Sequence, residues 1–123
     1  MRIIIAGSRT ITDHYEVLNA FGHALALWKP KEVTEIVSGG AKGVDASGEK
    51  IAEEFDIAVR VFPAEWDKHG KKAGVLRNIQ MAEHGDALLL VWDGKSKGSK
   101  NMKEVAEEMG LLVHERIVTA CLD

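Results

Sequence analysis

Three turns of the chain combine glycine with serine, arginine or lysine, the residue types that hold an anionic group. Glycine lets backbone N–H groups approach an anion because no Cβ blocks the way, and the first turn of a following helix offers further unpaired donors. Each such turn alone is typical of any tight turn, whereas three at one end of a domain indicate phosphate binding. The candidate ligand-binding residues in these turns are Gly7, Ser8, Arg9, Ser38, Gly39, Gly40, Lys42, Gly43, Gly98 and Ser99.

Three basic side chains accompany these turns and supply positive charge. Arg9 directly follows a glycine and a serine, so we expect it to contact the ligand. For Lys42 and Lys97, phosphate contact and a solvated surface position are equally open interpretations.

The connection from Pro63 to Lys72 is polar and long, so we expect a lid or a ligand-facing loop. Trp66 within it could stack on a base, close over the site, or cover apolar surface under the loop. Arg77 and Asn78 follow, near the ligand-proximal end of the next expected helix. A guanidinium there needs an anionic partner, so Arg77 is interpreted as a binding residue.

Two carboxylates are candidates for catalysis. Asp45 and Glu49 are four residues apart and share one face of the expected helix. Hydrolysis of an N-glycosidic bond needs a carboxylate that activates water or stabilises an oxocarbenium-like centre, and either residue could serve. Alternatively, Asp45 helps cap the helix and Glu49 is a solvated acid of its first turn. The five histidines show no metal-ligand spacing, so we predict no metal site.

The elements that must position these residues alternate between strand and helix. We expect strands at residues 2–6, 35–37, 58–62, 87–92 and 111–117, and helices at 13–28, from 44, at 73–83 and at 100–109. This alternation predicts an α/β fold, a single Rossmann-like three-layer domain over residues 1–123 with a mostly parallel five-stranded sheet in the order 3-2-1-4-5. A ligand should then bind beyond the carboxyl ends of the strands, where the order reverses between strands one and four.

Composition limits the function further. The 123 residues have a net charge of −3, which argues against tight binding to a nucleic-acid backbone. A single cysteine, Cys121, is interpreted as an inert free thiol in a reducing compartment. No apolar run reaches membrane-spanning length, and the first strand is too short for a signal sequence. We therefore expect a cytoplasmic protein without a membrane partner.

The motifs together resemble a known superfamily. Residues 7–9 (GSR), 38–45 (SGGAKGVD), 64–66 (AEW) and 77–78 (RN), with the glycine and serine at 98–99, are similar to the SLOG superfamily, particularly its small YspA-related branch in bacteria and their phages. The resemblance covers nearly the whole chain. It implies ligands such as nucleotides, ADP-ribose relatives or NAD derivatives, and a homodimer or higher homo-oligomer.

Two further families have a similar glycine-rich element. The DNA-processing protein A family binds single-stranded DNA, and the LOG phosphoribohydrolases cleave the N-glycosidic bond of nucleoside monophosphates with an arginine and a glutamate. This sequence departs from the LOG pattern because Lys42 is an extra residue and Val44 replaces a threonine.

Three functions follow, in order of preference. The first is binding of a nucleotide-type small molecule, with no other cofactor, by a sensor or sequestering protein. The second is an enzyme that hydrolyses a nucleotide N-glycosidic bond. The third, single-stranded DNA binding, ranks last because only seven aromatic residues are available and most lie in core-like patterns.

Overall fold

The strand β1 (Arg2–Gly7) lies at the centre of a parallel sheet because its side chains are apolar on both faces. Ile3, Ile4 and Ile5 are fully buried. In the computed structural model, which describes residues 1–119, β1 pairs with β2 (Glu35–Ser38) on one side and β4 (Ala87–Trp92) on the other. The edges are β3 (Ala58–Val61) and β5 (Leu112–Ile117). All five strands are parallel in the order β3-β2-β1-β4-β5, which confirms the predicted fold class and topology.

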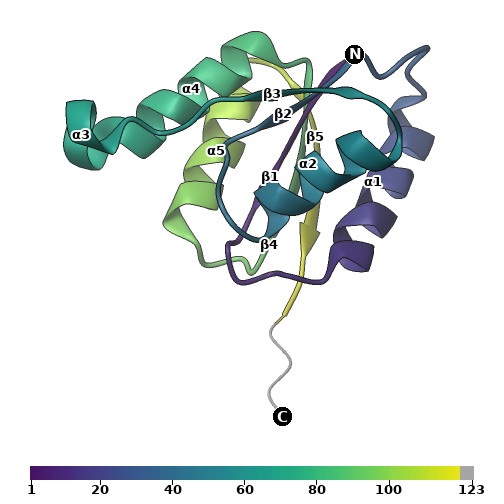
Figure 1. Cartoon of the computed structure of the whole chain (residues 1–123), viewed down its shortest axis with the longest axis horizontal. Coiled ribbons are helices and arrows are strands. Elements are labelled where there is room, and N and C mark those ends of the chain that lie inside the picture. Colours follow the sequence, from purple (N-terminus) through teal and green to yellow (C-terminus); the bar gives the residue numbers. More distant parts are fainter. Residues whose placement is uncertain (120–123) are drawn as a thin grey trace.

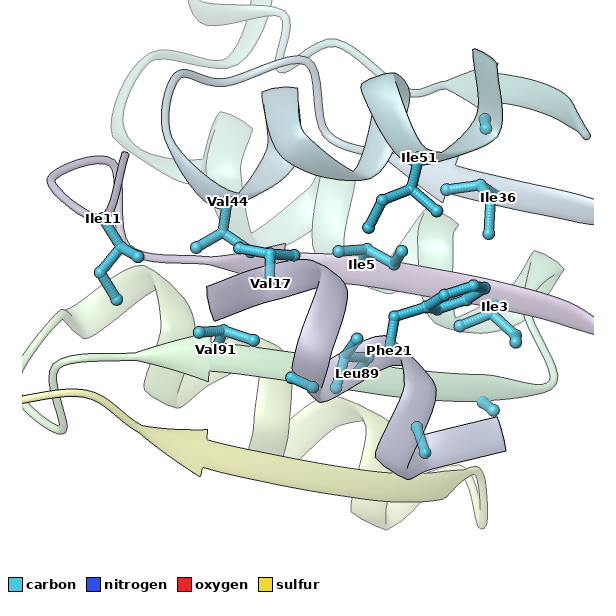
Figure 2. Packing of buried hydrophobic residues seen from close by; sticks show 14 residues of the cluster. Ile3, Ile5, Ile11, Val17, Phe21, Ile36, Val44, Ile51, Leu89 and Val91 are labelled. Carbon is cyan, nitrogen blue, oxygen red and sulfur yellow. The ribbon is translucent and has the colours of Figure 1, made fainter. Parts of the chain in front are cut away.

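Helices cover both faces of this sheet (Figure 1). On one face lie α1 (His14–Trp28) and α2 (Val44–Glu54), whose Val17, Phe21 and Ile51 pack on alternate residues of β1 and β4. Figure 2 shows these side chains meeting Ile5 and Leu89.

The other face is covered by α4 (Ala73–His84) and α5 (Lys97–Glu108). Their Met81 and Met102 pack against Ile4, Leu88 and Leu90. The side-chain period of two along each strand therefore supplies two separate apolar layers, one to each pair of helices.

Two helix ends follow from local chemistry. The side chain of Asp13 caps α1 by accepting a hydrogen bond of 3.0 Å from the Tyr15 amide. Gly110 adopts a positive φ of 76° just after α5 and so ends that helix before β5 begins.

The segment expected to be a loop at Pro63–Lys72 is largely helical. It contains the short helix α3 (Trp66–His69) and a 3₁₀ turn, η1 (Gly70–Lys72). None of its residues is buried, so it has no apolar stripe from which a helix could be predicted. Asp67 in its first turn and the basic residues in its last turn favour the helix through its dipole.

The helix α5 also begins earlier than expected, at Lys97 and not at Lys100. Ser96 is its N-cap and accepts a hydrogen bond of 3.4 Å from the Ser99 amide. The predicted turn residues Gly98 and Ser99 therefore belong to the first helical turn, because the serine cap outweighs the low helix propensity of glycine.

Cys121 lies outside the described residues. No helix among residues 1–119 has the length and apolar character needed to cross a membrane.

Candidate ligand-binding site

A cavity of about 670 Å³ opens beyond the carboxyl ends of the strands, between the connections that leave the sheet on either side of the switch point. Its volume is within the range of small-molecule sites. The predicted residues that line it are Gly7, Arg9, Gly39, Gly40, Lys42, Asp45, Trp66, Arg77, Asn78, Gly98 and Ser99. The predicted residues outside the lining are Ser8, Ser38, Gly43 and Glu49. The structure therefore brings all three glycine-bearing turns to one cavity.

The turn after β1 is tied to the end of β4. The backbone N–H of Ser8 donates to the carbonyl of Val91 at 3.1 Å, and the buried Ser8 hydroxyl accepts from the Asp93 amide at 3.0 Å. Gly7 packs so closely on β4 that a Cβ there would lie 1.7 Å from the Val91 oxygen. Ser8 thus acts as a bridge between the two connections at the switch point and does not face the cavity.

The Ser38 side chain stabilises the turn after β2 through hydrogen bonds. Its fully buried hydroxyl donates to Glu49 at 2.7 Å and accepts from the Gly40 amide at 3.0 Å. The Gly40 N–H is therefore already satisfied by the protein, so this turn presents fewer free amides than its glycines suggested. Glu49 faces Ser38, and Gly43 forms the N-cap of α2. Both residues shape the turn from outside the cavity.

Arg77 and Asn78, adjacent on α4, bridge the two sides of the cavity. The Arg77 guanidinium donates from Nη1 to the Gly39 carbonyl at 2.7 Å and from Nε to the Asn78 amide oxygen at 3.1 Å. The Asn78 nitrogen in turn donates to the Gly98 carbonyl at 3.3 Å and to Asn101 at 2.9 Å. These two residues therefore connect the turn after β2 to the first turn of α5.

Asp45 is a buried carboxylate in this cavity, only 4% exposed. Burial raises its pKa above the ordinary value, although the backbone N–H of Ala41, the charge of Arg77 and the N–H of Gly7 act in the opposite direction. The Ala41 hydrogen bond is long, at 3.4 Å. Burial likewise lowers the pKa of Arg77, and the nearby Asp45 charge partly restores it. Two neighbouring ionisable groups whose pKa values are both shifted by burial in one cavity are typical of functional sites.

Four cationic side chains line the cavity without an ion-pair partner among residues 1–119. Arg9 follows β1, Lys42 follows β2, Lys71 lies in η1, and Lys97 begins α5. All four are exposed. We call these four residues the rim cations. Each comes from a different connection of the sheet, so only the tertiary structure gathers them around one space.

Lys71 and Asn101 are among the lining residues that sequence reasoning missed. Lys71 lies in the connection predicted to face the ligand, and its charge was the signal that could have found it. Asn101 lines the cavity and holds Asn78, but a single asparagine in a helix gives no sequence signal of such a role. Trp66 lies on the cavity wall, 60% exposed, with its ring near Gly74. In the described part of the chain no group of three or more metal-ligating side chains occurs.

The topology, the cavity at the switch point and the glycine-bearing turns define a doubly wound parallel α/β domain of the Rossmann-like class. Comparison with known proteins supports a narrower assignment. Residues 1–69 match the model of the YspA, cpYpsA-related SLOG family, and the chain belongs to that family. A relative over almost the full length is the Gene 61 protein of Mycobacterium phage D29, 35% identical over 118 residues, which cover 91% of this chain and 93% of the phage protein. No solved structure matched the chain.

Proposed function

We propose that this protein binds a small phosphate-bearing molecule of the nucleotide type in the cavity at the carboxyl ends of its strands. The observation that carries the proposal is the set of four rim cations, unpaired among the described residues and drawn from four connections of the sheet. Exposed cations that converge on a cavity and form no ion pair among the described residues match an anionic ligand. Membership of the SLOG family is consistent with a nucleotide-related ligand.

The position of Trp66 in the cavity wall favours a ligand that has a base at one end. An exposed indole beside a cavity offers an apolar face on which a base can stack. The rim cations would then hold phosphate, and the cavity volume of about 670 Å³ accommodates both parts. We infer a sensor or sequestering role, because binding features outnumber catalytic ones.

A second candidate function is hydrolysis of a nucleotide N-glycosidic bond, and the position of Asp45 is the observation that favours it. Asp45 is a buried carboxyl with a raised pKa in the cavity, as a general acid or base requires. Glu49 faces Ser38 instead, so we assign any such chemistry to Asp45.

Isothermal titration calorimetry with AMP, ADP, ADP-ribose and NAD tests binding, and chromatography of the same mixtures tests turnover. We expect binding that weakens in Lys42→Gln and Lys97→Gln. Lys31→Gln is the matched control, because Lys31 is exposed and precedes β2, at the opposite end of the sheet. Binding without release of a free base or of ribose phosphate supports the sensor. Release of either product supports the hydrolase, and no binding of any nucleotide rejects both.

Two further expectations can be tested with the same protein. Nucleic-acid binding is the least favoured function, and a labelled single-stranded oligonucleotide that bound tightly and in a salt-sensitive manner would reverse that order.

We also propose a homodimer or higher oligomer in the cytoplasm. The exposed edge strand β3, with Val59 and Val61 accessible, supports self-association, which light scattering on the purified protein would measure.

A further inference from the structure

Asp45 differs in charge from the other ionisable side chains that line the cavity. Among the described residues, it is the one acid there, against five basic residues: Arg77 and the four rim cations. The rim cations are exposed, whereas Asp45 is 4% exposed and so lies deeper. The cavity therefore has a positive rim and a single negative group in its interior.

The hydrogen-bonding capacity of this carboxylate is largely unused. An ionised carboxylate accepts about four hydrogen bonds, but Asp45 accepts one long bond of 3.4 Å from the Ala41 amide, with weaker support from the Gly7 N–H. Arg77 makes no ion pair with it, since that guanidinium donates to the Gly39 carbonyl and to Asn78. The Asp45 carboxylate lies close to the backbone of Gly39: a Cβ built at Gly39 would be 2.7 Å from Oδ2 of Asp45.

A buried carboxylate constrains which part of a ligand can lie beside it. A phosphate would be repelled by the like charge, whereas a neutral O–H or N–H group would gain a charge-assisted hydrogen bond. The anionic part of the ligand must therefore stay near the rim cations, and a neutral hydrogen-bond donor must occupy the interior.

We propose that Asp45 accepts hydrogen bonds from the ribose hydroxyls of the ligand, so that the sugar lies inward and the phosphates lie at the rim. This inference rests on the proposed function. The vicinal diol of ribose supplies two adjacent O–H donors, and carboxylates recognise ribose hydroxyls in other doubly wound sheets. The site consequently selects ribonucleotides over deoxynucleotides and over single-stranded DNA.

The test compares ADP with 2′-deoxy-ADP and 3′-deoxy-ADP on the wild-type protein by calorimetry. We expect at least one deoxy analogue to bind about 10- to 100-fold more weakly, the loss that corresponds to one hydrogen bond to a charged group. In Asp45→Asn this preference should shrink severalfold, because the charged acceptor is gone. Inorganic pyrophosphate should bind Asp45→Asn at least as tightly as wild type, because the repulsion is also gone.

Glu53→Gln is the matched control, since Glu53 is an exposed acid on the same helix. Equal wild-type affinity for ADP and both deoxy analogues would overturn the inference while the proposed function stood. An Asp45→Asn protein that kept the full preference would do the same. If wild type bound none of the nucleotides, the proposed function itself would fail. The wild-type comparison does not depend on whether the variant folds.

Discussion

The guanidinium of Arg77 donates a hydrogen bond of 2.7 Å to the backbone carbonyl of Gly39. This contact joins α4 to the turn after β2 across 38 residues of sequence. A Cβ at Gly39 would lie 2.5 Å from the same Nη1 atom, so the side chain of Arg77 closes directly over that turn. The sequence predicts a ligand-binding role for Arg77. In this structure two of its N–H donors bond protein atoms, one of them in the turn after β2. The rim cations, by contrast, form no ion pair within residues 1–119.

Replacing Arg77 by lysine should loosen this turn. Lysine keeps the charge but has no planar fork, so it cannot hold Gly39 and Asn78 together. We expect backbone amides 39–41 to exchange hydrogen faster and ADP to bind about tenfold more weakly. Hydrogen exchange by mass spectrometry and calorimetry measure these effects. Arg60→Lys, on the exposed edge strand, is the control and should change neither.

Removing the Ser38 hydroxyl should destabilise the protein from inside the same turn. Ser38→Ala deprives Glu49 and the Gly40 amide of their partner in a buried position, which costs about 1–3 kcal/mol of the free energy of unfolding. Urea denaturation measures the loss. Ser47→Ala is the control, because Ser47 is a buried serine of the same region on α2, whereas the Gly40 amide and Glu49 bond the Ser38 hydroxyl. Equal losses in the two variants would contradict this role of Ser38.

The raised pKa of Asp45 should make stability depend on pH. Its folded-state pKa lies above the ordinary 3.8, so the folded chain binds the proton more tightly than the unfolded chain. The free energy of unfolding should therefore fall as pH rises from the unfolded to the folded pKa. Asp45→Asn removes that loss, and its stability advantage over wild type should grow over this range and then level off. Urea denaturation from about pH 3 to pH 8 tests the sign. An advantage that shrank with pH would contradict it.

A methyl group at Gly7 should disrupt the junction of β1 and β4. The new Cβ of Gly7→Ala would lie 1.7 Å from the Val91 oxygen, so the strands must separate, at a cost of about 1–3 kcal/mol or more. Gly22→Ala is a control of opposite sign. Gly22 lies in α1 with no atom within 4 Å of the new Cβ, so alanine should stabilise that helix by roughly 0.5–1 kcal/mol. Thermal unfolding of both variants distinguishes the effects.

Trp66 should report ligand binding by fluorescence. It is 60% exposed on the cavity wall, whereas Trp92 is 6% exposed in the sheet. A base stacked on Trp66 should quench its emission, and Trp66→Phe should abolish most of that change. Trp28→Phe should retain it, because Trp28 packs against the core that α1 covers. A ligand-induced change that survived in Trp66→Phe would place the base elsewhere.

The overall fold could be predicted because its signals are local. Runs such as Ile3–Ile5 and Leu88–Leu90 are apolar on both faces, as a strand buried between two helical layers requires. With strands and helices alternating, the handedness of crossovers leaves few possible orders, and the observed one was the prediction. The sequence did not predict α3 or the first turn of α5, because these segments contain too few apolar residues to show a hydrophobic period.

The sequence by itself determined the strands, the sheet order and the end of the sheet at which glycine-bearing turns gather. Tertiary structure alone decided what each polar side chain does there. The packing brings Ser38 into hydrogen-bond contact with Glu49 and directs the Arg77 guanidinium to the Gly39 carbonyl. It also gathers Asp45 and the rim cations around one cavity. The physical reason is the distance along the chain over which each kind of interaction acts. Strand and helix patterns repeat within a few residues, whereas these contacts join segments whose packing must exist before the side chains can meet.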